Sequence, residues 1–338
     1  MNRKHAKFRV LIPDHIDSPA EIEEQVFGPA AEVIAPKAEF IEEIPEDIWS
    51  SCDAILAYDC MRYEKPLLSR LSKCRVIVRA GIGTDNIDLE EARKRDISVC
   101  NVPDYCTEEV ADHTMAFLLA LVRGFPEHAE KVCLGRWERK SELTFRLRGK
   151  VFGIIGLGRI GSAVAVRAKA LGLKVVFYDP YIRPGYDKVL DAERLDSLEE
   201  VAYRGDIISI HTPLTEKTRA MIGPDFFSKV KKGAFLINTA RGPIVDITAL
   251  EQAMKEGLIR ACGLDVLSKE PPDDKLQLIK DFRNGAEWLS GRVIITPHSA
   301  YHSHEALDEV RLKSAAEAKR VLEGKRPLNC VNLKAQEK

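Results

Sequence analysis

The chain has 338 residues, more than one hydrophobic core usually supports, so two domains are expected. Its 51 Lys and Arg against 52 Asp and Glu give a formal net charge of −1, without a block of like charge. This balance argues against a nucleic acid partner and against a basic membrane-binding face. The sequence shows no apolar signal core and no run of about 18 apolar residues, so we expect a cytoplasmic protein.

The eight cysteines form no C-x-x-C pair, and no Cys/His cluster has zinc spacing. Cys100 and Cys262 lie inside apolar runs, which is typical of buried thiols. Free cysteines in a reducing compartment, without a metal site, are the prediction.

Up to about residue 103, short β-rich runs alternate with amphipathic helical stretches. The expected strands cover 8–13, 31–36, 53–58, 74–81 and 97–103. The expected helices between them cover 18–27, 64–73 and 88–96. Such alternation predicts a mostly parallel sheet covered by helices.

A long apolar helix follows. Thr107 is the expected N-cap residue, and the helix should link two lobes, with a second helix over 127–137. The apolar stretch 115–122 favours a symmetric homodimer built on these helices, although burial in the core explains it nearly as well.

A second strand–helix series begins at Lys150. The expected strands cover 150–158, 173–179, 206–213, 234–240, 259–266 and 292–298. The helix expected over 159–172 should end at Gly172, in a left-handed conformation. A last helix, over 303–324, should pack back on the first lobe. The prediction is an α/β protein with a discontinuous substrate domain, 1–103 plus 299–338, and an inserted nucleotide domain, 104–298.

The strongest local motif is the turn Gly156-Leu157-Gly158-Arg159-Ile160-Gly161 between an expected strand and helix. Its glycines allow a tight turn, close approach of a pyrophosphate and helix–strand packing, while the helix N-terminus supplies amide donors. Asp179 ends the next strand, 18 residues after Gly161, where it can accept hydrogen bonds from ribose hydroxyls. Because this carboxylate repels a 2′-phosphate, the motif predicts NAD rather than NADP.

Other residues at strand ends should face the same crevice, since ligands bind at the carboxyl ends of parallel strands. These candidates are His211, Thr212, Pro213, Thr239, Ala240, Arg241, Asp265 and His298.

Six ordered segments make the chain resemble the D-isomer-specific 2-hydroxyacid dehydrogenases over nearly its whole length. They are RAGIGTDNID (79–88), IGLGRIG (155–161), HTPLTEKTRAMIG (211–223), NTARGPIVD (238–246), GLDVLSKEPP (263–272) and TPHSA (296–300). The resemblance implies two Rossmann-like or flavodoxin-like parallel-sheet domains, with the nucleotide domain inserted into the substrate domain.

By this resemblance, Arg241 binds the substrate carboxylate, a task for which its fork of donors is suited. His298 matches the acid/base of the reaction, and Glu270 matches the carboxylate that orients it. Singly, each of these residues could equally be an ordinary surface or core residue.

The resemblance also assigns contacts around these groups. Ala80, Gly81 and Ile82 would bind substrate through backbone amides, and Thr114 and Asp265 would reach the cofactor. Tyr301 would form a wall of the substrate pocket.

The expected function is transfer of a hydride between NAD(H) and a small D-2-hydroxy acid or 2-keto acid. Segments 79–81 and 135–140 resemble the phosphoglycerate dehydrogenase branch, whereas 101–113 and 296–306 are closer to the C-terminal-binding-protein branch. The second branch offers an alternative, an NAD(H)-sensing corepressor with incidental turnover. The substrate stays open at this point.

Overall fold

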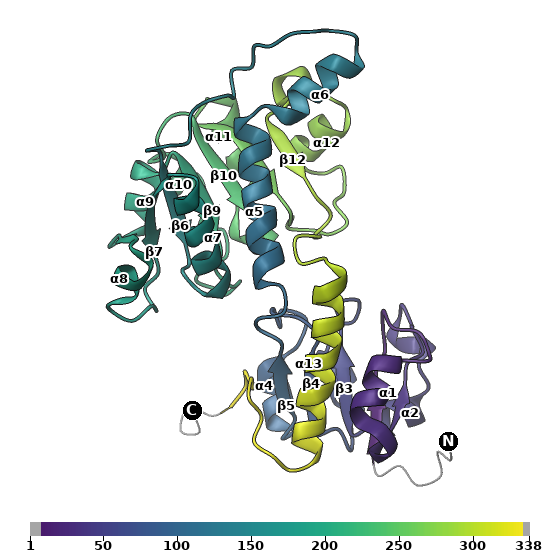
Figure 1. Ribbon diagram of the computed structural model, residues 1–338. Coiled ribbons are helices and arrows are strands. Elements are labelled where there is room, and N and C mark those ends of the chain that lie inside the picture. Colours follow the sequence, from purple (N-terminus) through teal and green to yellow (C-terminus); the bar gives the residue numbers. More distant parts are fainter. Residues whose placement is uncertain (1–7, 334–338) are drawn as a thin grey trace. The chain divides into compact units, whose positions relative to one another are not determined.

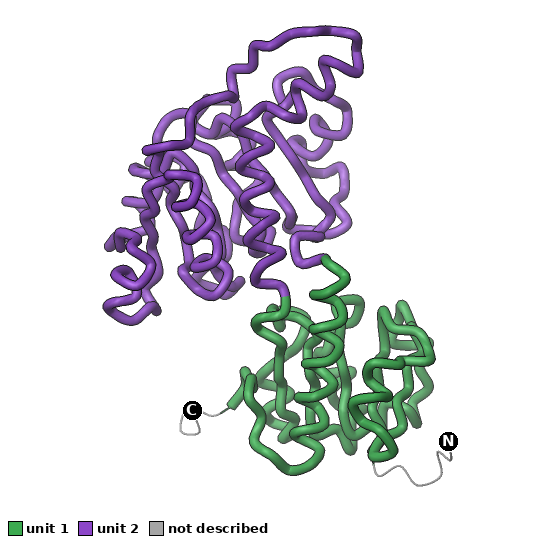
Figure 2. The backbone as a smooth tube through the Cα atoms, viewed as in Figure 1, with its two compact units in different colours: residues 1–105, 303–338 green, residues 106–302 purple. Residues whose placement is uncertain are grey.

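The computed structural model describes residues 8–333. The chain divides into two compact units, which are coloured separately in Figure 2. Unit 1 contains residues 1–105 and 303–338, and unit 2 contains residues 106–302. The chain therefore leaves unit 1, builds all of unit 2 and returns to unit 1.

Unit 1 is built on a five-stranded sheet in which every strand pair is parallel. Its strands are β1 (Phe8–Leu11), β2 (Ala31–Ile34), β3 (Ala54–Ala57), β4 (Val76–Arg79) and β5 (Ser98–Asn101). The order β2-β1-β3-β4-β5 is that of flavodoxin-like folds. All five strands were predicted, each two or more residues too long, because the predicted ranges included flanking residues that lie outside the strands, among them Pro13, Pro36 and Pro103.

The helices of unit 1 are short except for the last. They are α1 (Glu21–Phe27), α2 (Glu46–Ser51), α3 (Lys65–Leu68), α4 (Leu89–Lys94) and α13 (His304–Leu322). Two 3-10 turns, η2 (Gly28–Ala30) and η3 (Ile41–Glu43), complete the unit. Helix α13 packs on α1 and on β4, as Figure 1 shows. Helix α2, with the buried Trp49, was missed by the sequence analysis.

Unit 2 is built on a seven-stranded parallel sheet of order β12-β11-β10-β9-β6-β7-β8. Its strands are β6 (Val151–Ile155), β7 (Lys174–Tyr178), β8 (Glu193–Arg194), β9 (Ile207–Ile210), β10 (Ala234–Asn238), β11 (Ile259–Leu264) and β12 (Val293–Ile295). The order reverses at β6 and β9, which is the switch point of a doubly wound fold. The fold class expected from the sequence is thereby confirmed.

Helices cover both faces of this sheet (Figure 1). They are α5 (Thr107–Val122), α6 (Phe125–Cys133), α7 (Arg159–Ala170), α8 (Tyr186–Leu190), α9 (Leu198–Arg204), α10 (Pro224–Phe227), α11 (Ile247–Lys255) and α12 (Gln277–Arg283). The 3-10 turns are η4 (Gly242–Ile244) and η5 (Glu287–Leu289). Helix α7 ends before Gly172, whose φ of 78° confirms the predicted left-handed residue.

Helix α5 packs against α7, β10 and β11. Its apolar residues, including Phe117 and Leu121, are buried in a core shared with β6 and β10. Core burial thus accounts for five residues of the stretch 115–122, namely Met115, Phe117, Leu118, Leu121 and Val122. The N-cap residue is Cys106 rather than Thr107, so the predicted cap is one residue off. The second helix, α6, ends at Cys133 instead of 137.

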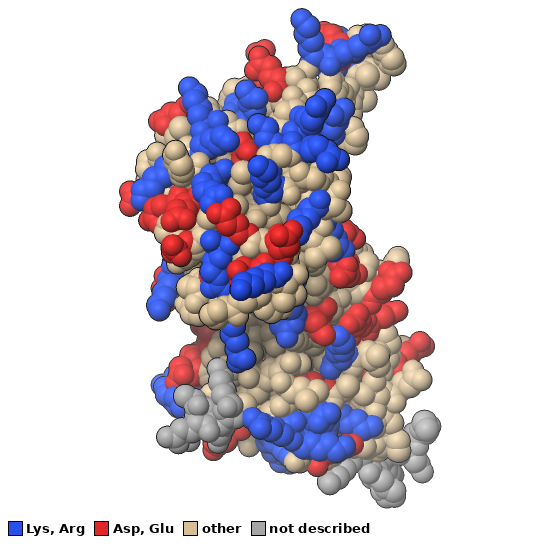
Figure 3. All heavy atoms as spheres, turned by 60° about the vertical axis from the view of Figure 1, so that its left-hand side comes forward, with Lys and Arg blue, Asp and Glu red and all other residues tan. Residues whose placement is uncertain are grey.

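Charged side chains of both signs are interspersed on the face of unit 2 drawn in Figure 3. This mixture agrees with the net charge of −1. Among residues 8–333, no helix is long and apolar enough to cross a bilayer.

We expect one buried ion pair to be essential for the stability of unit 1. Glu23 on α1 is fully buried and receives two hydrogen bonds from Arg311 on α13, at 2.9 and 2.7 Å. Arg311→Met leaves this carboxylate buried without its partner, which should cost about 3–5 kcal/mol. Urea unfolding measures the loss.

The matched control is Lys325→Met, which breaks an exposed pair with Glu323 and should cost at most about 1 kcal/mol. The double variant Glu23→Gln/Arg311→Met should recover part of the loss. Equal unfolding midpoints for Arg311→Met and Lys325→Met would show that the buried pair is dispensable.

Candidate active site

A glycine-rich turn joins β6 to α7. Gly156 has a φ of 93°, and a Cβ there would lie 2.8 Å from the carbonyl oxygen of His211. At Gly161 a Cβ would lie 2.1 Å from the carbonyl oxygen of Gly156, so the helix packs directly on the turn. The space beside Gly158 is open. Packing therefore requires the outer glycines, whereas the middle one leaves the N-terminus of α7, at Arg159, accessible to an anion.

Asp179 follows β7, and its carboxylate is bonded to the same turn. Oδ2 accepts a hydrogen bond from the Leu157 amide at 2.8 Å, and Oδ1 accepts one from the Tyr181 amide at 2.8 Å. Because a carboxylate offers about four acceptor positions, each oxygen can still accept a further donor. Asp179 thus fixes the glycine-rich turn and keeps acceptors beside it.

The segment after β9 supplies the next wall. Burial lowers the pKa of His211 to about 3, so its ring is neutral at physiological pH, and its Nε2 lies 2.8 Å from Ser209 Oγ. Thr212 lies next to Gly156, and its buried hydroxyl has no hydrogen-bond partner among the described residues. A buried, unpartnered hydroxyl beside an open glycine turn fits a polar ligand such as a dinucleotide.

Asn238, at the end of β10, holds the turn that carries Arg241. Its Oδ1 accepts from the Ala240 amide and its Nδ2 donates to the Arg241 carbonyl, both at 3.0 Å. At the next residue, Gly242, a Cβ would lie 1.9 Å from the carbonyl carbon of Leu267. The Arg241 turn is therefore in direct backbone contact with the segment that follows β11.

That segment carries Glu270, which is paired with His298. The distance between Glu270 Oε2 and His298 Nδ1 is 2.6 Å, and Oε1 accepts from the Leu267 amide at 2.8 Å. Burial alone would raise the pKa of Glu270. The contact with His298, the Leu267 amide and the charge of Arg241 outweigh burial, so the pKa lies below its usual value. A carboxylate–imidazole pair and a guanidinium thus come together at one edge of the sheet.

His298 lies on a loop organised by Asp265. This carboxylate is 2% exposed and accepts hydrogen bonds from Thr296 Oγ1 and from the Ser299 and Ala300 amides at 2.5, 2.8 and 3.0 Å. The His298 amide donates to the Asp265 carbonyl at 2.8 Å. His298 has a φ of 51°, which costs free energy in a residue with a side chain. The contacts of Asp265 stabilise this conformation.

Two further candidates lie near these groups. The ring of Tyr301 packs edge-on toward His298, with 6.4 Å between ring centroids. Thr114 on α5 is fully buried, donates to the Val110 carbonyl and contacts Thr239 Oγ1 at 3.0 Å. Thr114 therefore holds the hydroxyl of Thr239 in position through this contact.

The remaining candidates, Ala80, Gly81 and Ile82, follow β4 in unit 1. The Ala80 amide donates to a β3 carbonyl and the Gly81 amide to that of Arg79, so both are already engaged. The amides of Ile82 and Gly83 donate to no group within the described residues. The Arg79 guanidinium contacts the Ala80 carbonyl and crosses the side of Gly81, while its buried Nε has no partner among those residues. The loop therefore combines open amides with a positive charge.

The sequence analysis missed three supporting side chains. The position of Asn238 at the end of a strand could have indicated its role, because Asn side chains in turns often form hydrogen bonds with nearby backbone groups. Arg79 belongs to the segment 79–88, but nothing in the sequence shows that its Nε is buried. Thr296 also contacts His113 Nε2, at 3.0 Å, a contact across 183 residues that no local pattern reveals.

Comparison with known proteins places this site in a family. Residues 115–300 match the model of the NAD binding domain of D-isomer specific 2-hydroxyacid dehydrogenases. The match contains the glycine-rich turn, Asp179, Arg241, Glu270 and His298.

Individual relatives agree. The chain is 36% identical over 326 residues to the D-3-phosphoglycerate dehydrogenase of Methanocaldococcus jannaschii, covering 96% of this chain but 59% of that protein. The chain thus spans about three fifths of the length of that relative.

Two solved structures match over almost the full length of both chains. One is the D-lactate dehydrogenase from Aquifex aeolicus complexed with NAD and lactic acid, with a TM-score of 0.81, 30% identity and coverage of 93% and 96%. The other is a glyoxylate reductase from Paecilomyes thermophila, with a TM-score of 0.85, 25% identity and coverage of 98% and 99%. Because the family model spans more than half of the chain, the protein belongs to the D-isomer specific 2-hydroxyacid dehydrogenase family.

Proposed function

We propose that the protein is an NAD-dependent oxidoreductase that interconverts a small D-2-hydroxy acid and its 2-keto acid. The observation that carries the proposal is the 2.6 Å contact between His298 Nδ1 and Glu270 Oε2, beside the Arg241 guanidinium. This set provides a proton donor and acceptor together with a cation for a carboxylate. Unit 2 is the nucleotide domain in this proposal, and unit 1 is the substrate domain.

The cofactor would be held by the turn between β6 and α7. The open side of Gly158 would let the pyrophosphate reach the amides at the start of α7, around Arg159 and Ile160. Asp179 would accept hydrogen bonds from the hydroxyls of the adenosine ribose. When bound, NADH supplies the hydride for reduction. The buried Thr212 hydroxyl, which has no hydrogen-bond partner among the described residues, would bind a polar group of the cofactor. Pro213, Thr239, Ala240 and Asp265 would complete the proposed wall.

His298 handles the proton of the substrate oxygen. Because Glu270 is ionised, it can only accept, so Nδ1 of His298 carries a proton and Nε2 remains for the substrate. In reduction the protonated ring donates from Nε2, and in oxidation the neutral ring accepts there. Glu270 orients the ring and stabilises its charged form.

Arg241 binds the substrate carboxylate through its fork of donors and stabilises charge on the reacting oxygen. In unit 1, the loop of Ala80, Gly81 and Ile82 is a second proposed carboxylate-binding element, because the Ile82 amide donates to no group within the described residues and the Arg79 guanidinium lies beside it. Tyr301 closes the pocket with an aromatic wall that also carries a hydroxyl. The guanidinium of Arg241 makes anionic 2-keto acids the proposed substrate class.

Oxidation of NADH in the presence of 2-keto acids of graded size and charge tests the proposal. The set should contain the keto acids that correspond to lactate and to 3-phosphoglycerate. At least one should be turned over, and Arg241→Lys should lower kcat/KM strongly, since lysine lacks the bidentate fork. Tight NADH binding with negligible turnover of every acid would instead favour an NAD(H)-sensing, corepressor-type protein.

Asp179→Ala should weaken NADH binding by roughly 10- to 100-fold, the loss of a hydrogen bond to a charged group, about 1.5–3 kcal/mol. The preference for NADH over NADPH should become smaller, because the charge that repels the 2′-phosphate of NADPH is removed. Asp179→Asn keeps the size of the side chain, so it reports the effect of charge alone. Fluorescence titration with both cofactors measures these changes.

The control for Asp179 is Asp196→Ala, an exposed aspartate in the same unit, which should leave both affinities unchanged. An unaltered NADH/NADPH ratio in both Asp179 variants would remove this residue from the proposed role.

Glu270→Gln should shift the pH profiles of kcat/KM downward in both directions. The lowered pKa of Glu270 means that the wild type holds a negative charge beside the imidazole at neutral pH. A neutral amide stabilises the charged ring less, so the acid limit of oxidation and the alkaline limit of reduction both move to lower pH. A shift on the order of one pH unit corresponds to about 1.4 kcal/mol.

Cofactor binding should stay nearly intact in Glu270→Gln, and Asp273→Asn, on the same loop but paired with Lys269, serves as the control. Profiles that stay in place, or that move upward, would show that Glu270 is not the charged partner of His298.

We further propose a homodimer formed through α6 and the segment after it. Val132, Leu134 and Trp137 are exposed, Trp137 to 81%, so apolar surface lies beyond the buried part of α5. Light scattering at micromolar concentration should give about twice the chain mass of 37.9 kDa, and Trp137→Asp should lower it. A monomeric mass for the wild type would contradict the dimer.

The eight free cysteines suit a reducing compartment, so we assign the enzyme to the cytoplasm.

A further inference from the structure

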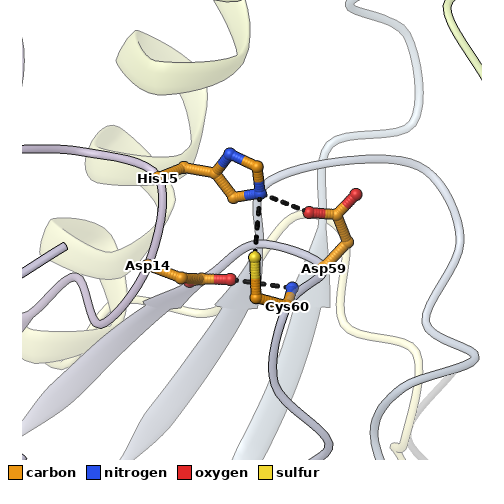
Figure 4. A group of neighbouring side chains, drawn as sticks. All are labelled: Asp14, His15, Asp59 and Cys60. Atoms are coloured by element: carbon orange, nitrogen blue, oxygen red, sulfur yellow. Dashed lines mark hydrogen bonds and ion pairs between the residues drawn. The ribbon is translucent and has the colours of Figure 1, made fainter. Parts of the chain in front are cut away.

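Four side chains with metal-binding atoms meet in unit 1, whereas Arg241, Glu270 and His298 belong to unit 2. They are Asp14, His15, Asp59 and Cys60, which follow the adjacent parallel strands β1 and β3 (Figure 4). One ligand atom from each lies within 4.8 Å of the others. Asp14 is buried, and the other three are exposed.

The buried carboxylate fixes the arrangement. Asp14 accepts hydrogen bonds from the Tyr58 and Cys60 amides at 3.2 and 3.0 Å, which holds the loop after β3 against the loop after β1. His15 Nε2 lies 2.5 Å from Asp59 Oδ1 and 3.4 Å from Cys60 Sγ. Both contacts involve the same ring nitrogen, as Figure 4 shows.

This geometry excludes a Cys–His–Asp nucleophile. In such a triad the histidine uses one nitrogen for the thiol and the other for the carboxylate, whereas here Nε2 faces both. Burial, together with the charges of Asp14 and Asp59, also raises the pKa of Cys60 to about 11. The thiol is therefore protonated at neutral pH, the opposite of an activated nucleophile.

We propose that Asp14, His15, Asp59 and Cys60 bind one divalent transition-metal ion of the borderline class, with Zn²⁺ as its representative. Imidazole, thiolate and carboxylate are the three ligand types that Zn²⁺ accepts in tetrahedral sites. A thiolate and an imidazole disfavour Mg²⁺ and Ca²⁺, which require oxygen ligands.

The distances suit such an ion with one adjustment. Tetrahedral coordination at usual bond lengths separates an imidazole nitrogen from a thiolate sulfur by about 3.6 Å, close to the 3.4 Å between His15 and Cys60. A nitrogen and a carboxylate oxygen would be about 3.4 Å apart, so the 2.5 Å contact of His15 with Asp59 must open. Both side chains are exposed and can rotate without disturbing the core.

The charges balance as well. Two carboxylates and the thiolate that forms on binding carry three negative charges, while Cys60 loses its proton to solvent. The Arg79 guanidinium, which acts electrostatically on His15 and Asp59, supplies one positive charge. A dication neutralises the remaining two. With four protein ligands the site would be closed, so its expected role is to fasten the two loops together rather than to activate water.

Cobalt(II) reports directly on the proposed ligands. After dialysis against a chelator, the full chain should bind one equivalent of Co²⁺ with the ligand-field bands of a tetrahedral site and a thiolate-to-metal charge-transfer band. Stoichiometric Zn²⁺ should displace it and raise the midpoint of thermal unfolding.

Cys60→Ser should abolish the charge-transfer band, and His15→Gln should weaken Co²⁺ binding by more than about tenfold, the loss typical even of changes outside the ligand sphere. Cys133→Ser, which removes the exposed cysteine of α6, is the matched control and should keep the band. Circular dichroism confirms that each variant is folded. Binding without a thiolate band, a band that persists in Cys60→Ser, or no stoichiometric binding would each overturn the proposal.

Discussion

Every strand pair of unit 2 is parallel, and this constraint decides where its chemistry lies. Parallel strands need crossovers, which return each chain segment to the same starting edge. All carboxyl ends therefore meet at the other edge. Five candidate elements each follow a different strand: the glycine-rich turn, Asp179, His211, Arg241 and Asp265. They are spread over 109 positions, from 156 to 265, and the parallel topology brings all of them to the same edge.

Within this edge, backbone contacts decide the fine geometry. Gly242 lies so close to Leu267 that no side chain fits between the turn of Arg241 and the segment of Glu270. The buried Asp265 then uses both oxygens and its carbonyl to hold the loop of His298 in a left-handed conformation. Three loops that carry the guanidinium, the carboxylate and the imidazole are thus mutually fixed. Such preorganisation is what general acid/base chemistry requires.

Much of this organisation could be read from the sequence. The strands were found because apolar runs of suitable length recur with turn residues between them, and the glycine-rich turn is specific because each of its glycines has a separate physical reason. Helices α2, α3 and α10 escaped or were misjudged because four to six residues hold too little periodicity. The N-cap residue was misplaced by one position because Cys106 makes no side-chain capping hydrogen bond, whereas the prediction relied on the capping preference of threonine. Long-range partners such as Thr296 and His113 require the fold itself.

In unit 1 the strands are also parallel, so the loops that follow them meet at one edge of its sheet. Strands β1, β3 and β4 are neighbours, so the cluster of Asp14, His15, Asp59 and Cys60 and the loop after Arg79 end on one side of one sheet. Zinc spacing was not visible because the ligands come as two dipeptides 45 positions apart, and only strand adjacency joins them. The proposed cation-binding cluster and the anion-binding loop share one positive charge. The Arg79 guanidinium acts electrostatically on His15 of the cluster, and it also contacts the Ala80 carbonyl of the loop. A dication at the cluster would neutralise the Asp59 carboxylate, on which Arg79 acts, so the charge of Arg79 would act more fully on an anion bound at the loop.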